Sequence, residues 1–281
     1  MTEKKNMFEY CDELVDQFEK VIENPILEKS SVYYTGVDLG TACVVIAVLD
    51  ENYRPVAGAY RYADVVRDGM VVDYIGAVNI VRELKKEIEE KLNTELIYAA
   101  AAIPPGTDSL DGGAIKNVVQ AAGFELTNLL DEPTAANEVL KIQNGAVVDI
   151  GGGTTGTSIV KDGKVVYVAD EATGGTHFSL VVSGAYGMNF SDADKFKRDK
   201  VNHKELLPVL KPVIEKVASI ISLHIKNHDV REISLVGGTA CLTGLEDIIE
   251  KQIKIYTYKP KNPMFVTPLG IALSCTSKVI D

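Results

Sequence analysis

The spacing of apolar side chains alternates between short continuous runs and stripes that recur every three to four residues. Short runs bounded by turn residues indicate strands, and the stripes indicate amphipathic helices. We expect strands at residues 33–38, 43–49, 54–61, 96–103, 126–130, 146–150, 155–160, 164–170 and 233–236. We expect helices at residues 76–92, 111–122, 133–143, 176–186, 191–200, 209–227, 243–252 and 268–273. Strands that alternate with helices predict a layered α/β architecture with mixed sheets.

One helical stripe precedes this α/β body. Apolar side chains recur at helical spacing over residues 7–23, and Asn24-Pro25 ends the helix. One interpretation is a helix that docks on its own domain. The other is an amphipathic peptide that binds in the groove of a partner. Deleting residues 1–30 distinguishes them, because a large fall in melting temperature would show that the helix belongs to the core.

Two stretches of the chain follow one plan. Val37–Thr41 and Val148–Thr154 each place an aspartate at the end of an apolar run, followed by a Gly/Thr-rich turn and a second apolar run. The turns that come next, at residues 50–52 and 161–163, also fall at matching offsets. This pattern predicts a duplicated β-hairpin, and a duplicated unit predicts two similar lobes that face one cleft.

The residue types of the two turns suit a nucleotide. Glycine lets backbone N–H groups approach an anion, and a threonine hydroxyl adds a donor. The carboxylates of Asp38 and Asp149 can hold Mg²⁺ through water. The candidate phosphate-binding residues are Gly40, Thr41, Gly151, Gly152, Gly153 and Thr154. Two such turns facing each other would hold the phosphates of one nucleotide from both sides.

Two further segments add candidate chemistry. Glu132 lies beside Pro133 at a predicted helix start, where an acid could orient water for phosphoryl transfer. Gly237-Gly238 follows a predicted strand, and its glycines let a flat ring or a sugar pack on bare backbone. Taken alone, an acid at Glu132 is explained as helix capping, and a glycine pair after a strand is a weak signal.

Composition narrows the classes of function. The net charge is −11, so an acidic surface disfavours binding to nucleic acid or to an anionic membrane. No apolar run approaches the length of a membrane span, and no apolar signal core follows the N-terminal residues. The four cysteines share no metal-ligand spacing and are typical of free thiols in a reducing compartment. We therefore expect a cytoplasmic protein.

The order of the glycine and acidic motifs resembles the actin/DnaK-type ATPase superfamily, which includes FtsA, PilM and MreB. The resemblance spans about residues 32–275 and rests on five ordered segments: Asp38–Thr41, Asp131–Ala136, Asp149–Thr154, Gly174–His177 and Gly237-Gly238. Three more segments make the chain similar to the EutJ family of ethanolamine-utilisation proteins: Arg67–Asp73, Ile103–Asp108 and Asp170–Gly175. That family is described as chaperone-like and is encoded with the bacterial microcompartment machinery for ethanolamine breakdown.

The resemblance implies an actin-like ATPase fold with two similar ribonuclease-H-like lobes around a nucleotide cleft, in a minimal version without the large insertion subdomains. We expect the N-terminal helix and a linker at residues 1–31, lobe I at 32–144 and lobe II at 145–263. The segment 264–281 is expected to pack back on lobe I as a helix.

The resemblance also implies roles for single residues, with ATP or ADP and Mg²⁺ as cofactors. Asp38 and Asp149 would bind Mg²⁺ and its waters, and Glu132 would sit near the attacking water. The glycines and threonines of the two turns, from Gly40 to Thr154, would hold the phosphates. Gly237 and Gly238 would contact the nucleoside, and the cofactor-binding set also includes Gly174 and Gly175.

Three departures from the superfamily pattern lower the expected activity. DnaK-type proteins carry a second aspartate in the second turn, where this chain has Gly156. Their catalytic lysine has no convincing match in residues 51–75, where Arg67 is only a loose candidate. Residues 200–232 hold little more than one helix, where actin-like ATPases insert a subdomain that holds adenine and ribose. We therefore expect slow hydrolysis or none.

The function that we expect is a nucleotide-switched, chaperone-like accessory protein of ethanolamine utilisation, associated with a microcompartment. Its partner would be an ethanolamine-degrading enzyme or a shell protein, bound through residues 7–23, and the chain would be a monomer or small oligomer without filaments. One alternative is a degenerate actin-like fold that acts as a nucleotide-independent adaptor or targeting protein. A third is a small-molecule kinase, which shares the fold, because fold alone does not fix function.

Overall fold

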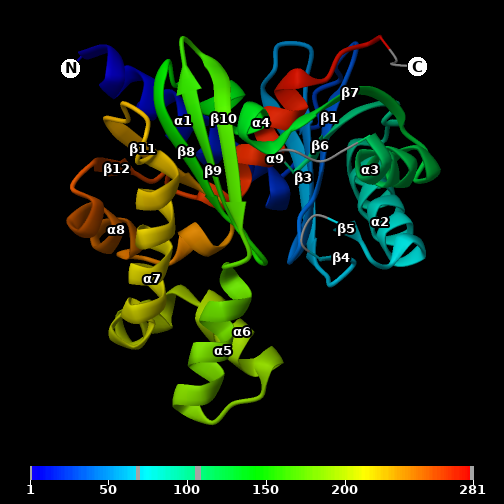
Figure 1. Ribbon diagram of the computed structural model, residues 1–281. Helices are drawn as coiled ribbons and strands as arrows, with labels where there is room; N and C mark the ends of the chain where they lie inside the picture. Colours follow the sequence, from blue (N-terminus) through cyan, green and yellow to red (C-terminus); the bar gives the residue numbers. More distant parts are fainter. Residues whose placement is uncertain (1, 68–69, 105–108, 279–281) are drawn as a thin grey trace. The chain divides into compact units, whose positions relative to one another are not determined.

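The chain forms two compact units, which a computed structural model describes for residues 2–67, 70–104 and 109–278. Unit 1 comprises Met1–Lys141 and Phe265–Asp281, and unit 2 comprises Ile142–Met264 (Figure 1). Positions 68–69 and 105–108, which belong to two of the segments that carried the resemblance, lie outside the described residues. The chain thus enters unit 2 once and returns to unit 1 at its C-terminal end.

Unit 1 is built on a five-stranded mixed sheet. Its strands are β1 (Tyr34–Leu39), β2 (Cys43–Leu49), β3 (Pro55–Tyr62), β6 (Tyr98–Ile103) and β7 (Glu125–Asp131). They lie in the order β3-β2-β1-β6-β7, with β1, β2 and β3 antiparallel and β1, β6 and β7 parallel. A two-stranded ribbon joins β4 (Val66–Arg67) and β5 (Met70–Val71). The helices of unit 1 are α1 (Thr2–Glu23), α2 (Tyr74–Leu92), α3 (Ser109–Ala121), α4 (Glu132–Leu140) and α9 (Val266–Ser274).

Unit 2 repeats the same sheet. Its strands are β8 (Asn144–Ile150), β9 (Thr155–Lys161), β10 (Lys164–Glu171), β11 (Glu232–Val236) and β12 (Tyr256–Tyr258). Their order is β10-β9-β8-β11-β12, with the first three antiparallel and the last three parallel. The helices are α5 (Gly175–Tyr186), α6 (Phe190–Arg198), α7 (His203–Ile225) and α8 (Leu245–Ile253), with short 3₁₀ turns η1 (Lys200–Asn202), η2 (Thr239–Cys241) and η3 (Pro263–Phe265). Order and direction match unit 1 strand for strand, so the duplicated hairpin is confirmed at the level of whole sheets.

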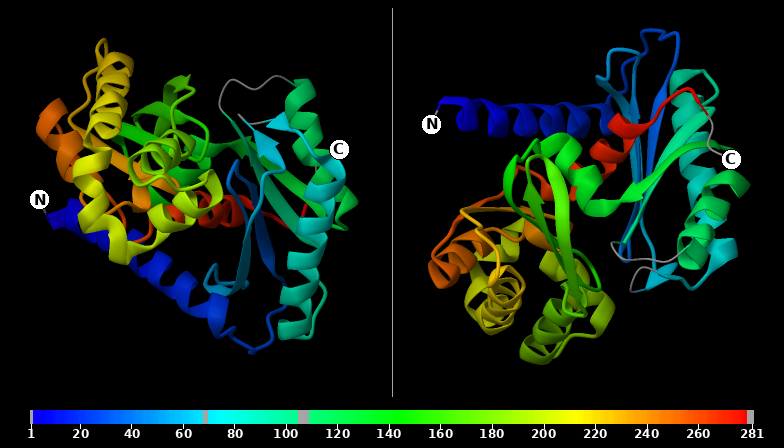
Figure 2. Two further views of the ribbon diagram at one scale, coloured as in Figure 1. Left: turned by 90° about the horizontal axis from the view of Figure 1, so that it is seen from below. Right: turned by 45° about the horizontal axis from the view of Figure 1, so that its top comes forward.

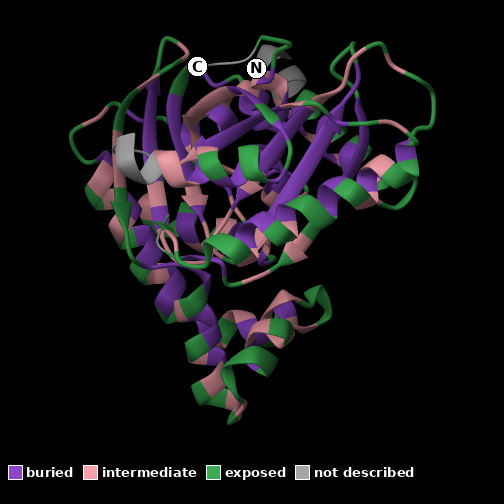
Figure 3. Cartoon of the chain, turned by 90° about the vertical axis from the view of Figure 1, so that its right-hand side faces the viewer, coloured by how far each residue is buried: buried purple, intermediate pink, exposed green. Residues whose placement is uncertain are grey.

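Each sheet carries an apolar core. In unit 1, the apolar faces of α2 and α3 pack on one face of the sheet, and these two helices lie side by side (Figure 2). On the opposite face, Ala100 and Ala102 of β6 pack with Ala135 of α4 and Ile271 of α9. In unit 2, α5, α7 and α8 bury their apolar residues with Ala146, Val148 and Ile150 of β8. Strands β2, β6, β8 and β11 are accordingly buried along most of their length (Figure 3).

Helix α9 approaches its neighbours more closely than side chains would allow. A Cβ atom at Gly270 would overlap the carbonyl oxygen of Ala135 in α4, and one at Gly36 would meet the backbone of α9. Glycine is therefore needed at both positions because backbone packs directly on backbone. The close packing holds the C-terminal segment on unit 1.

Helix α1 packs within unit 1. The Phe18 ring lies edge-on to Phe265 at a centroid distance of 5.1 Å and covers Gly58 of β3. Phe18 is fully buried, and Leu14, Val15 and Val21 of the same stripe are buried with it. Of the two interpretations of this helix, the structure favours docking on the chain's own unit.

Two parts of unit 2 differ from the expected elements. Strand β12 was not predicted, because it has three residues and only Thr257 of them is buried, which leaves no apolar run to detect. Helix α7 begins at His203 rather than at 209, and it accommodates Pro208 and Pro212. The segment 200–232 otherwise holds one long helix, as predicted. Within the described residues, no helix is long and apolar enough to cross a membrane, and all four cysteines are free thiols.

Candidate functional site

The turn between β8 and β9 presents unpaired backbone donors. Asp149 is the penultimate residue of β8. Gly151–Thr154 forms the turn that follows, which is closed by a 3.0 Å hydrogen bond from the Gly151 N–H to the Thr154 carbonyl. Within the described part of the chain, no hydrogen bond uses the N–H groups of Gly152, Gly153 or Thr154. Successive open N–H groups in a glycine turn form a concave anion-binding site. The turn therefore fits a phosphate group.

Two distant segments pack against this turn. The Gly175 N–H donates to the Gly151 carbonyl at 2.9 Å, and the Thr176 N–H donates to the Gly152 carbonyl at 2.8 Å. The Thr239 hydroxyl also donates to the Gly151 carbonyl, at 2.7 Å. A Cβ atom on Gly174 would lie only 2.8 Å from the Thr154 nitrogen, so glycine is required there. The structure thus brings together the three predicted glycine segments of unit 2.

The glycines of the Gly237-Gly238 pair differ in what they do. Gly237 has a φ of +90°, and a Cβ atom there would overlap the carboxylate of Asp149. Gly238 has ordinary helical angles, and a Cβ atom there would meet nothing within 4 Å. The backbone angle and the contact with Asp149 therefore require glycine at 237, whereas neither backbone nor packing explains glycine at 238. A bare backbone beside open space is what a bound ring or sugar would require.

Asp149 is electrostatically unusual. Burial, followed by the negative charge of Asp170, raises its pKa to about 6. An ionised carboxylate in such a place is stabilised by a cation. Among the described residues, no group of three or more His, Cys, Asp or Glu side chains could hold a metal on its own. This donor set fits Mg²⁺, which keeps several waters and binds through one or two carboxylates plus substrate phosphates.

The predicted site residues of unit 1 lie at one edge of its sheet. Asp38 is near the end of β1, and the following turn is closed by a 3.1 Å bond from the Gly40 N–H to the Cys43 carbonyl. Thr41 lies in that turn. Glu132 begins α4 directly after β7, and Asp131 caps this helix by accepting from the Thr134 N–H at 2.9 Å. Because β1 and β7 run parallel on either side of β6, Asp38 and Glu132 lie at the same edge of the sheet, where these strands end.

Asp194 and Lys197 are two polar residues that lie beside the glycine segments. Neither was among the site residues predicted from the sequence. The Lys197 Nζ donates to the Gly175 carbonyl at 2.9 Å, to the Ser179 hydroxyl at 2.7 Å and to Asp194 Oδ1 at 2.9 Å. Burial lowers the pKa of Lys197, and the charge of Asp194 partly offsets this. Burial alone would raise the pKa of Asp194, but Lys197, together with the Ser179 hydrogen bond and the charge of Arg198, lowers that pKa. The three-residue spacing of Asp194 and Lys197 on one helix was the sequence signal that could have predicted this ion pair.

His203 connects α6 to the loop before α8. Its Nδ1 accepts from the Thr243 N–H at 3.0 Å, so Nε2 carries the proton and donates to the Lys197 carbonyl at 3.1 Å. Burial lowers the pKa of His203 below its ordinary value of 6.5. The neutral ring is therefore the form that fits, because a proton on Nδ1 would face the Thr243 N–H.

A pH-dependent loss of stability follows from His203. Its folded-state pKa is depressed, so its contribution is present above about pH 6.5 and is lost as the pH falls towards the folded-state pKa. We expect His203→Asn to cost about 1–2 kcal/mol at pH 7.5 through the lost hydrogen bonds, and less at pH 5. Urea unfolding of both proteins at the two pH values measures this difference. An equal cost at both pH values would contradict the assignment of the neutral ring.

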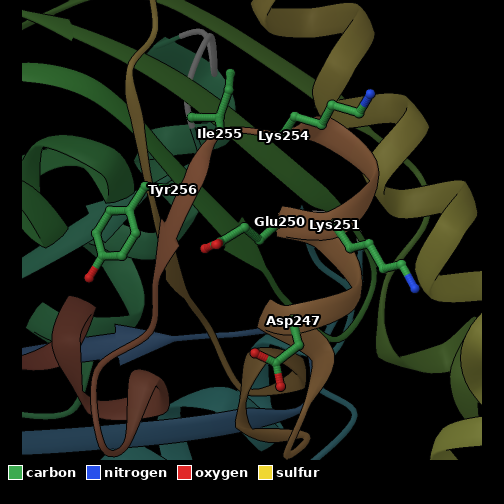
Figure 4. Close-up of a pocket in the computed structure, with 6 residues that line it drawn as sticks. All are labelled: Asp247, Glu250, Lys251, Lys254, Ile255 and Tyr256. Carbon is green, nitrogen blue, oxygen red and sulfur yellow. The ribbon is translucent and has the colours of Figure 1, made fainter.

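A hollow of about 360 Å³ lies in unit 2 between α8 and β12. It is lined by Asp247, Glu250, Lys251, Lys254, Ile255 and Tyr256, and the two lysines point away from Glu250 (Figure 4). Glu250 accepts from the Thr257 N–H at 2.8 Å and so serves the local fold. None of the predicted site residues lines this hollow, and the glycine turn remains the candidate site.

Comparison with known proteins agrees with this arrangement. The family model of the type IV pilus assembly protein PilM matches residues 119–264. The ethanolamine utilization protein EutJ of Salmonella typhimurium is 44% identical over 246 residues, which cover 87% of this chain and 86% of that protein. The crystal structure of EutJ from Carboxydothermus hydrogenoformans is 46% identical, with a TM-score of 0.89 over 94% of this chain and 98% of that one.

A more distant structure shows the fold alone. MreB5 of Spiroplasma citri, solved bound to ADP, is 18% identical, with a TM-score of 0.68 over 86% of this chain and 96% of that one. The predicted actin-like fold is therefore confirmed, in a version with only α5, α6, η1 and α7 described between β10 and β11. On identity and coverage, this chain belongs to the EutJ family of ethanolamine utilization proteins, within the actin-like ATPase superfamily.

Proposed function

We propose that this chain is a chaperone-like accessory protein of ethanolamine utilisation that binds a Mg²⁺-nucleotide and hydrolyses it slowly or not at all. The observation that carries the proposal is the convergence of three glycine segments around Asp149, with open N–H groups at Gly152–Thr154. A structural hairpin does not need this convergence. A relative of the same fold, MreB5, is bound to ADP.

In this proposal each group has a defined task. The N–H groups of the Gly151–Thr154 turn bind phosphate oxygens, and the turn at Gly40 and Thr41 in unit 1 does the same. Asp149 and Asp38 orient Mg²⁺ through its water ligands, and Mg²⁺ when bound neutralises the phosphate charge. Gly238 leaves room for the nucleoside, and Glu132 orients a water molecule.

Slow turnover is supported by what the site lacks. Gly156 provides no carboxylate in the second turn, and Arg67 is only a loose candidate in residues 51–75 for a catalytic cation. Lys197 is held by three acceptors beside Gly175, which suits a structural or binding role better than movement during catalysis. A nucleotide that binds without rapid hydrolysis would shift the protein between two conformations.

The proposed partner is an ethanolamine-degrading enzyme or a microcompartment shell protein. The apolar stripe of α1 is buried, and Phe18 packs on Phe265 in unit 1. A partner would therefore meet the outward face of α1, at residues such as Tyr10, which is 42% exposed. The alternative is a nucleotide-independent adaptor, which the missing carboxylate at Gly156 favours.

Co-purification with candidate partners tests the switch against the adaptor. The full chain is incubated with each ethanolamine-degrading enzyme and shell protein in Mg-ATP, in Mg-ADP or without nucleotide. We expect association with one of them to differ at least about tenfold between these states, which corresponds to roughly 1.4 kcal/mol of coupling. Association that is equal in all three states would support the adaptor instead.

A further inference from the structure

Three positions line up on the face of the unit 2 sheet opposite to α7. Asp149 of β8 pairs with Gly156 of β9, and Gly156 pairs with Asp170 of β10. Residues paired across neighbouring strands point to the same face of a sheet. The carboxylates of Asp149 and Asp170 therefore lie on one face, separated by a strand that has no side chain at this level. Val148, one residue earlier on β8, faces the core with α7.

Glycine at 156 is not required by the fold. Its φ is not in the left-handed region, and a Cβ atom there would meet only Asp170 Oδ1, at 3.5 Å. The space above Gly156 is thus bordered by the Asp170 carboxylate, which lies where a side chain at 156 would point.

The two acids also interact electrostatically. The charge of Asp170 is, after burial, the second cause that raises the pKa of Asp149. Two carboxylates held on one face repel each other, and a divalent cation between them would lower that cost. Asp170 is exposed and lies on the edge strand β10, so a hydrated cation could reach its carboxylate from solvent.

We propose that Asp170 supplies the second carboxylate of the Mg²⁺-nucleotide site, in place of the one that Gly156 lacks. Asp170 acts with Asp149 on the water ligands of Mg²⁺, across the gap that Gly156 leaves. This inference rests on the proposed nucleotide function and adds to it a residue that determines how far Mg²⁺ strengthens nucleotide binding. Its neighbour Glu171 pairs with Thr155 and points to the opposite face.

Titration calorimetry with ADP, in Mg²⁺ and in EDTA, tests the role of Asp170. We expect Mg²⁺ to tighten ADP binding in the wild type. In Asp170→Asn this tightening should fall at least about tenfold, whereas the affinity for metal-free ADP stays unchanged. Glu171→Gln, a matched loss of one negative charge on the same strand, should behave as the wild type.

A relocation variant makes the test specific. Gly156→Asp combined with Asp170→Asn returns the carboxylate to β9 and should restore the Mg²⁺ effect. Melting temperatures establish that each variant is folded. An Asp170→Asn protein with the wild-type Mg²⁺ effect, or an equal loss in Glu171→Gln, would overturn the inference and leave the proposed function standing. A wild type that binds no ADP in either condition would overturn both.

Discussion

Replacing Gly270 by alanine is expected to destabilise unit 1 by about 3 kcal/mol or more, the upper end of the usual cost of overpacking. The added methyl group would overlap the carbonyl oxygen of Ala135, which is backbone of α4 and has no flexible end to move aside. Helices α4 and α9 would have to separate. The packing of these two helices on Ala100 and Ala102 of β6 would be lost in part.

Thermal unfolding measures this effect, and for a unit of this size about 3 kcal/mol lowers the melting temperature by roughly 6–12 °C. Gly113→Ala is the matched control, because Gly113 also lies in a helix of unit 1 and its Cβ would meet nothing within 4 Å. That substitution is expected to stabilise by about 0.4–1 kcal/mol through the unfolded chain. A Gly270→Ala protein that melts with the wild type would contradict the close packing of α9.

Gly238→Leu is expected to weaken Mg-ADP binding by at least about 100-fold, roughly 2.7 kcal/mol, without lowering the melting temperature. Gly238 has helical angles and open space around its Cβ position, so the fold accepts a side chain there. A leucine would instead fill the space that the proposed nucleoside occupies. Calorimetry with Mg-ADP and a thermal melt provide the two readouts.

The neighbouring glycine supplies the contrast. Gly237→Ala would place a methyl group on the Asp149 carboxylate and would strain a backbone with a φ of +90°. It should therefore lower the melting temperature as well as nucleotide affinity. Full nucleotide affinity in Gly238→Leu would show that the open space at 238 does not serve the nucleoside.

The fold was predictable because its signals are local. An apolar run, an aspartate and a glycine turn identify each hairpin, and they occur twice at matching offsets. Gly237-Gly238 was found as a glycine pair after a predicted strand and Gly174-Gly175 through the family resemblance, and the structure brings both segments to the Gly151–Thr154 turn. Glycines that must accept close backbone contacts are visible in sequence as glycines.

The contribution of Asp170 was not predictable, because it depends on register between strands. Asp170 belongs to a segment that helped to establish the resemblance, but only its pairing through Gly156 shows that it lies on the same face of the sheet as Asp149. Lys197 likewise reaches Gly175 from a different helix. Strand β12 escaped prediction because three residues carry too little apolar pattern. In each case the information lies in tertiary contacts rather than in neighbouring residues.

Titration calorimetry of the wild type and of Asp149→Asn with Mg-ADP at pH 8 tests whether the glycine turn beside Asp149 binds nucleotide. The pKa of Asp149 is raised to about 6, so ionisation opposes folding increasingly as the pH rises through that value. Asp149→Asn should therefore be at least as stable as the wild type at pH 8. We predict a dissociation constant of about 1 μM for the wild type and a loss of at least about 100-fold in the variant. No heat and no thermal shift at millimolar Mg-ADP would contradict the account and leave the adaptor as the function of this chain.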